Sequence, residues 1–199
     1  MIDIKSMTDE ELAVRYVEGD NSAFDELLRR NQSKIFTYIM FIVKDEELAN
    51  DIFQNTFIKV IVSLQEGRYV PSGKFFYWLT RIAHNVIMDC YRAQRSEHIV
   101  EPTSDNDLSN LNENSMQDTY VEAEMVRDQT MQDLRRMVAS LSPAQREVVY
   151  MHYYQGMPFR EIAKVTGVSI NTALGRMRYA LINLRKMADK YDIVLDAEG

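Results

Sequence analysis

The side chains in this sequence that are best suited to chemistry are polar and basic groups able to hydrogen-bond nucleic acid. Asn171, Thr172, Arg176 and Arg178 fall within the short segment INTALGRMR. Asn and Arg can each form two hydrogen bonds with one base edge in the major groove. Residues 160–190 contain seven basic and two acidic side chains, an excess that attracts phosphates. These residue types predict a surface that binds duplex DNA.

A second basic run, KFFYWLTRIAHNVIMDCYRAQR, places cations and aromatic rings on one face of a predicted helix. Lys74, Trp78, Arg81, Asn85 and Arg92 fall within about 60° of arc at helical spacing. Basic grooves with aromatic rings bind unpaired bases, and each stacked base contributes about 1–3 kcal/mol. The alternative is that these rings belong to the core, and for Trp78 both alternatives stay open.

The remaining reactive side chains lack the spacing of an enzyme or a metal centre. Cys90 is the single cysteine, and His84, His98 and His152 do not have metal-ligand spacing with it or with one another. The sequence also lacks a glycine-rich phosphate loop. We therefore expect no catalytic residue, metal, cofactor or small-molecule substrate. Cys90 is interpreted as an inert buried thiol.

A helix-turn-helix pattern must position the residues of the first surface. In FREIAKVTGVSINTALGRMRYALINLRK, Ala163 is small where two helices approach, Gly167 suits a left-handed turn, and Ser169 can cap the second helix. In this motif the second helix lies in the major groove. The alternative is an ordinary helical hairpin with a solvated basic face.

Helical periodicity divides the second helix into two faces. The predicted packing face contains Ala173, Met177, Ala180, Leu181 and Leu184, and the predicted free face contains Asn171, Leu174, Gly175 and Arg178. Gly175 costs about 1 kcal/mol relative to Ala in a helix interior. We hypothesise that it permits close approach to DNA.

Charge divides the 199-residue chain into three parts. The net charge is −2 over residues 1–95, −8 over residues 96–124 and +3 over residues 125–199. The middle part is rich in Ser, Asn, Asp and Glu, a composition typical of a flexible linker. Fully extended, it would span about 100 Å. We predict an all-α protein with two small helical domains, 1–95 and 125–199, joined by this acidic linker.

Capping signals mark where several helices begin. Thr8 with Glu11 and Ser142 with Gln145 fit capping boxes, and Asp45 precedes a third helix as its N-cap. The sequence has no basic-then-apolar leader and no long uncharged apolar run. We therefore expect a cytoplasmic protein.

The helix DEELANDIFQNTFIKVI is apolar around much of its circumference. Such a helix is either buried centrally or docked on a partner. Its own residues leave these alternatives open.

The ordered set of motifs resembles the extracytoplasmic-function (ECF) branch of the bacterial sigma factors, the initiation subunits of RNA polymerase. DEELANDIFQNTFIKVI resembles region 2.2, FFYWLTRIAHNVIMDCYR resembles regions 2.3 and 2.4, and LSPAQREVVYMHYYQGMPFREIAKVTGVSINTALGRMRYAL resembles region 4. The resemblance covers nearly the whole chain, and a polar linker replaces a third domain.

This resemblance implies three sets of binding residues. The first would dock on the clamp helices of the largest subunit of core RNA polymerase: Leu48, Asp51, Ile52, Gln54 and Asn55. The second would capture the melted minus-ten strand of promoter DNA: Arg68, Lys74, Trp78, Arg81, Asn85 and Arg92. The third would read the duplex minus-thirty-five element: Ser169, Asn171, Thr172, Arg176 and Arg178.

The resemblance also implies a dedicated anti-sigma factor, which in this family is often anchored in the membrane. The sequence departs from the family at Asn55, where an acidic residue is usual, and at Leu174 and Gly175, which replace a common Lys-Ser pair. One alternative is a helix-turn-helix regulator that binds DNA without polymerase. A second is an adaptor that binds protein but shows no promoter preference.

Overall fold

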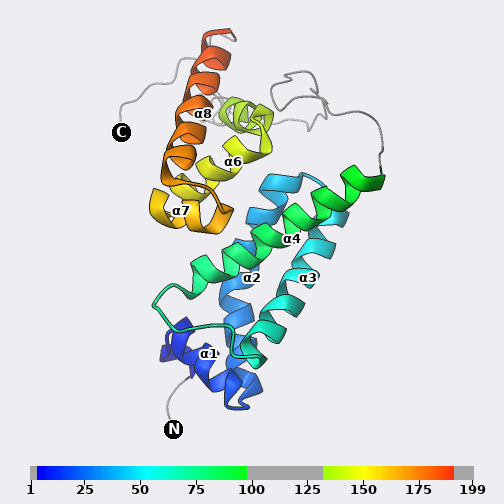
Figure 1. Cartoon of the computed structure of the whole chain (residues 1–199), viewed down its shortest axis with the longest axis vertical. Coiled ribbons are helices and arrows are strands. Elements are labelled where there is room, and N and C mark those ends of the chain that lie inside the picture. Colours follow the sequence, from blue (N-terminus) through cyan, green and yellow to red (C-terminus); the bar gives the residue numbers. More distant parts are fainter. Residues whose placement is uncertain (1–3, 98–131, 191–199) are drawn as a thin grey trace, which may run out of the picture. The chain divides into compact units, whose positions relative to one another are not determined.

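The computed structural model describes residues 4–97 and 132–190, and these residues form helices joined by turns and loops (Figure 1). No strand occurs within these two ranges. The prediction of an all-α fold is confirmed. None of the helices in the described ranges is long and apolar enough to cross a membrane.

Contacts between Cα atoms divide the chain into two compact units. The first contains α1–α4 and α7, and the second contains α6, the π-helix η2 and α8. Most of the predicted linker lies outside the described residues, so the boundaries 1–95, 96–124 and 125–199 stay predictions.

The first unit begins with a short 3-10 helix, η1 (Ile4–Ser6), followed by α1 (Asp9–Val17), α2 (Asn21–Val43), α3 (Glu46–Gln65) and α4 (Phe75–Glu97). The short helix α7 (Phe159–Thr166) completes it. Apolar side chains from each of the four long helices are at most 2% exposed and form its core: Leu12, Leu27, Ile35, Ile39, Ile52, Leu64, Leu79 and Ile87. Burial of this apolar surface is the main stabilising contribution.

Side chains at the predicted N-caps start α1 and α3. Thr8 and Glu11 form both halves of a capping box, with the Thr8 N–H donating to Glu11 Oε2 at 2.7 Å. The Asp45 carboxylate accepts from the Leu48 N–H at 2.9 Å. Each cap satisfies a backbone donor that has no partner within its own helix. These two predictions are confirmed.

A polar network fastens α1 to α2. Asn31 Nδ2 donates to Asp9 Oδ2 at 3.0 Å, and Arg30 Nη1 donates to Asp9 Oδ1 at 3.2 Å. Arg30 Nε and Arg29 Nη2 donate to Glu26 Oε1 at 2.6 and 2.7 Å. Hydrogen bonds from these two arginines, Arg29 first, lower the pKa of Glu26 to about 2.

The second unit is built from α6 (Pro143–Val149), the π-helix η2 (Tyr150–Tyr154) and α8 (Ile170–Lys190), and residues 132–140 are also helical. Ser142 caps α6 as predicted, accepting from the Gln145 N–H. The side chain of Gln145, however, is used elsewhere: its Oε1 accepts from Asn183 Nδ2 of α8 at 3.1 Å. The π-helix was not predicted, because helical periodicity does not distinguish its wider turn.

Candidate nucleic-acid interfaces

The turn before α8 has the geometry that the sequence predicts. Gly167 ends α7 in the left-handed conformation with φ 67°, and the Val168 N–H donates to the Ala163 carbonyl oxygen at 3.0 Å. Only residues 167–169 separate α7 from α8. A side chain at Gly167 would be strained at this φ.

The N-terminal half of α8 presents polar side chains to solvent. Asn171, Thr172 and Arg178 are exposed, and Arg176 is half-buried. Ser169 is exposed and precedes the helix. The structure thus brings the predicted minus-thirty-five residues together at one end of α8.

Of the five residues predicted for the packing face of α8, three are buried, Leu184 is half-buried and Leu181 is exposed. Ala173, Met177 and Ala180 are buried, whereas Leu181 is 37% exposed. Leu181 therefore does not belong to the core. Periodicity placed it near the edge of the apolar arc, where tertiary packing decides burial.

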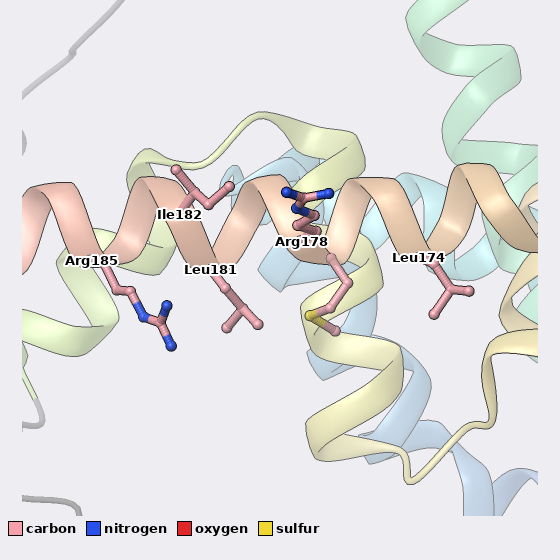
Figure 2. Close-up of a pocket in the computed structure, with 6 residues that line it drawn as sticks. Leu174, Arg178, Leu181, Ile182 and Arg185 are labelled. Atoms are coloured by element: carbon pink, nitrogen blue, oxygen red, sulfur yellow. The ribbon is translucent and has the colours of Figure 1, made fainter.

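Leu181 contributes to an open groove on α8. The groove is lined by Leu174, Met177, Arg178, Leu181, Ile182 and Arg185. In Figure 2, Leu174, Leu181 and Arg185 extend from the same side of the helix. The free side of α8 therefore combines apolar and cationic side chains.

Gly175 lies inside the N-terminal half of α8 with free space around it. Apart from its chain neighbours and the adjacent helix backbone, a Cβ added there would meet no atom of the described residues within 4 Å. Packing within the protein therefore does not require glycine at this position. This agrees with the hypothesis that glycine is needed at this position for close approach to DNA.

The second predicted surface contains an aromatic cluster at the start of α4. Trp78 is half-buried, with its ring centroid 4.6 Å from Tyr69 and 5.5 Å from Phe75. Phe75 is 4% exposed and belongs to the core. Trp78 thus packs partly against the core and is partly accessible to solvent. Its position combines the two alternatives that the sequence left open, a core ring and a ring that stacks on an unpaired base.

Polar side chains continue this surface along α4. Arg81 and Asn85 are exposed. Arg92 is also exposed and lies 3.1 Å from Asp89 Oδ1. The cationic character is therefore strongest near Arg81 and weaker toward the C-terminal end of α4.

The loop before α4, residues 68–74, carries two more predicted cations. Arg68 pairs with Glu66, and Lys74 Nζ lies 2.7 Å from Glu161 Oε1 of α7, in the same unit. The hydrogen bond from Lys74 is the largest influence that lowers the pKa of the Glu161 carboxyl. Each of these two cations therefore has an acidic partner in the free protein.

Tyr69 anchors the loop to α1. Its hydroxyl donates to Glu10 Oε2, and the other carboxylate oxygen of Glu10 accepts from the Phe75 N–H at 2.9 Å. Burial first, and then the hydrogen bond to Glu10, raise the pKa of the Tyr69 hydroxyl well above its usual value. Sequence reasoning missed Glu10, because an acid in the first turn of a helix is already explained by the helix dipole.

The predicted polymerase-docking residues lie on α3, and their exposure differs. Asp51, Gln54 and Asn55 are exposed, and Leu48 is half-buried. Ile52 is 2% exposed, so it packs in the core of the unit and offers no surface to a partner.

Two further apolar residues are exposed on the same face of α3. Ile58 is 58% exposed and Val62 is 40% exposed. They follow Asp51 and Asn55 at intervals of seven residues, so the four form a docking stripe on one side of the helix. The interval of seven residues between Asp51 and Ile58 is the sequence signal that could have placed Ile58 on this face.

Cys90 is half-buried, whereas the sequence predicts a buried thiol. Burial, with a smaller contribution from Asp51, raises the pKa of the Cys90 thiol. His84 is 7% exposed. Within residues 4–97 and 132–190, no group of three His, Cys, Asp or Glu side chains could hold a metal ion.

Two family models match the chain. Residues 27–97 match Sigma-70 region 2, and residues 131–179 match Sigma-70 region 4. The RNA polymerase sigma factor CarQ of Myxococcus xanthus is 30% identical over 183 residues, which cover 90% of this chain and 97% of CarQ. The chain belongs to the ECF branch of the RNA polymerase sigma factors.

Other similar proteins agree with this assignment. The RNA polymerase sigma-H factor of Pseudomonas aeruginosa is 27% identical over 184 residues, covering 92% of each chain. The structure is also similar to that of CnrH in complex with the cytosolic domain of CnrY, with a TM-score of 0.62 and 23% identity over 92% of this chain and 97% of CnrH.

The sigma factor RpoE in complex with the anti-sigma factor NepR, from Bartonella quintana, has a TM-score of 0.60 and 18% identity, covering 83% of this chain and 96% of that one. At such identities these structures show a shared fold. The ECF sigma factor assignment favours transcription initiation over a regulator that acts without polymerase, because the N-terminal helices match region 2.

Proposed function

We propose that this ECF sigma factor divides promoter recognition between two differently built surfaces. Loop 68–74 and the face of α4 bearing Trp78, Arg81 and Asn85 hold the unpaired minus-ten strand. The N-terminal half of α8 reads the duplex minus-thirty-five element. The observation that carries this proposal is the half-buried Trp78 beside exposed Arg81 and Asn85, because a partly accessible ring next to cations suits stacking of an unpaired base.

The proposed polymerase contact is the docking stripe of Asp51, Asn55, Ile58 and Val62, together with exposed Gln54. Its centre combines two large exposed apolar side chains with polar neighbours. Protein–protein interfaces commonly have an apolar centre and a polar rim. We assign Ile52 a supporting position in the core and Leu48 a place at the edge of the stripe. The partner is the clamp helices of the largest polymerase subunit.

An anti-sigma factor is proposed as the second protein partner. Support comes from the two solved structures of similar fold, which are complexes of CnrH with CnrY and of RpoE with NepR. We propose that the chain acts in the cytoplasm, where core polymerase works, and that it acts by binding rather than as an enzyme.

The test combines purified chain with bacterial core RNA polymerase and a library of genomic promoter fragments. We expect co-elution with polymerase and transcripts that start downstream of a shared two-part motif. Duplex binding without polymerase association would contradict the proposal and favour the regulator. Association without initiation would favour the adaptor.

The docking stripe is tested in the same assay with Asp51→Arg and Ile58→Asp. Both variants should lose co-elution, because each places an unpaired charge in an interface that excludes water. Asp25→Arg, at an exposed position of α2, is the matched charge reversal and should co-elute like the unchanged protein. Equal loss in all three variants would show that the effect is not specific to the docking stripe.

A further inference from the structure

Glu10 joins three elements of the first unit through one carboxylate. It lies in the first turn of α1, and its two oxygens accept from the Tyr69 hydroxyl in the loop and from the Phe75 N–H at the start of α4. These contacts span 59 and 65 positions of the sequence. Glu10 therefore makes tertiary contacts, although its position in the first turn of a helix suggests only local ones.

The contact with Phe75 caps α4 from outside the helix. The Trp78 N–H donates to the Lys74 carbonyl oxygen at 3.1 Å, so the helical bonding of α4 begins at Lys74. The Phe75 N–H belongs to the first turn, where backbone donors have no partner within the helix. A carboxylate that accepts this bond also interacts favourably with the helix dipole. Glu10 thus fixes where α4 begins.

The contact with Tyr69 fixes the aromatic cluster. The Tyr69 ring lies 4.6 Å from Trp78 and 5.4 Å from Phe75, and its hydroxyl is held by the carboxylate. Trp78 is therefore supported on one side by a ring that cannot turn away without losing a charge-assisted hydrogen bond. Val70, the next residue of the loop, is 74% exposed.

Glu10 is itself held in place by its neighbours in the first turn. Asp9 accepts from Asn31 and Arg30 of α2, and Glu11 completes the capping box with Thr8. The three consecutive acids therefore have different partners. The helix end that carries Glu10 is therefore also held by contacts that do not involve the loop.

We propose that Glu10 is a positioning residue for capture of the unpaired promoter strand. It touches no DNA in this role; it holds Tyr69 against Trp78 and sets the start of α4, which pre-organises loop 68–74 and the stacking surface. Pre-organisation raises affinity because the side chains need not be ordered when the strand binds. The inference rests on the proposed function of the α4 surface.

The first test uses the fluorescence of Trp78, the only tryptophan of the chain. In the free full-length protein, Glu10→Ala should make Trp78 more accessible to quenching by acrylamide, because Tyr69 is released. Tyr69→Phe keeps the ring but loses the hydroxyl, and should produce part of the same change. Glu47→Ala is the matched control, since Glu47 is also in the first turn of its helix, α3. Unchanged quenching in Glu10→Ala would overturn the proposal.

The second test measures strand capture by the complex of the full-length chain with core polymerase. The probe is a fluorescent single-stranded oligonucleotide carrying the non-template minus-ten sequence of the promoter that gives most transcript. Glu10→Ala should weaken capture about tenfold, the loss expected for a hydrogen bond to a charged group. Affinity for the duplex minus-thirty-five half should be unchanged. Glu10→Gln keeps an acceptor for the Phe75 N–H and should fall between.

The outcomes separate the inference from the proposed function. Capture by the unchanged protein with equal capture by Glu10→Ala would overturn the role of Glu10 and leave the proposed function standing. No capture by the unchanged protein would overturn both. If Glu10→Ala melts at a much lower temperature, the test rests on Glu10→Gln and Tyr69→Phe. In these two variants strand capture should weaken in proportion to the increase in acrylamide quenching of Trp78. Weaker capture without increased quenching would contradict a positioning role for Glu10.

Discussion

The two proposed DNA surfaces are built in different ways. The α4 surface depends on an aromatic cluster whose members come from the loop and from α4, and which Glu10 of α1 holds in place. The α8 surface consists of side chains that project from one helix. An unpaired strand is flexible and needs a pre-organised site, whereas a duplex is a rigid partner that a helix can read directly. We therefore expect the α4 surface to be sensitive to distant substitutions and the α8 surface mainly to direct ones.

The largest effect is expected from Trp78→Ala. Loss of one stacked base should cost about 1–3 kcal/mol, or roughly 5- to 150-fold in strand affinity. Capture of the minus-ten oligonucleotide by the polymerase complex measures it. Tyr153→Ala removes a ring that is 63% exposed in η2 and should leave capture unchanged. Normal strand capture by Trp78→Ala would contradict the claim that the α4 surface, unlike the α8 surface, depends on an aromatic cluster.

A comparable but sequence-specific loss is expected from Arg178→Ala. A bidentate contact to a base contributes about 1–3 kcal/mol of discrimination. Binding of the polymerase complex to duplex minus-thirty-five fragments with and without single base changes measures this term. The control is Arg135→Ala, which removes an exposed cation from the helix at residues 132–140. A uniform loss on all fragments would assign Arg178 to phosphate instead of a base.

A smaller effect is expected at Gly175. Gly175→Leu should weaken duplex binding by steric exclusion without lowering the melting temperature, because a Cβ meets nothing within 4 Å. Gly175→Ala should raise the free energy of unfolding by about 1 kcal/mol. Thermal melts and duplex titrations of both variants provide the measurement. Unchanged binding by Gly175→Leu would refute close approach at this position.

The smallest effect at neutral pH concerns the polar network between α1 and α2. In this network Arg30 joins Glu26 to Asp9, the residue before Glu10. Because the pKa of Glu26 is lowered to about 2, its stabilising contribution is complete above its ordinary value of 4.5. That contribution is lost as the pH falls from 4.5 toward 2. Glu26→Gln should therefore lower the melting temperature at pH 7 and reduce its dependence on pH over this range. A parallel pH profile in both proteins would exclude Glu26 as the titrating group.

Local signals predicted the helices well because their causes are local. Thr8, Asp45 and Gly167 act within a few positions of the chain, and each appears where the sequence indicates. The faces of α8 were also predictable, since Ala173 and Met177 are well inside the apolar arc. The ordered motifs were sufficient to indicate the family.

Features that depend on distant contacts could not be predicted in this way. Glu10 and Tyr69 are 59 positions apart, and neither residue type suggests the other. Ile52 and Ile58 are both apolar residues of α3, but packing buries one and leaves the other 58% exposed. Gln145 fits a capping box, yet its side chain bonds Asn183. In each case the tertiary partner decides what the side chain does.

Site-specific crosslinking tests most directly whether the α4 and α8 surfaces bind different promoter elements. A photoreactive amino acid would be placed at Trp78 or at Arg178 of the full-length chain, in complex with core polymerase on its strongest promoter. We predict that position 78 crosslinks to the unpaired non-template strand of the minus-ten element, and only after melting. Position 178 should crosslink to duplex minus-thirty-five DNA before and after melting. Crosslinks from position 78 to duplex DNA, or from both positions to one element, would contradict the division.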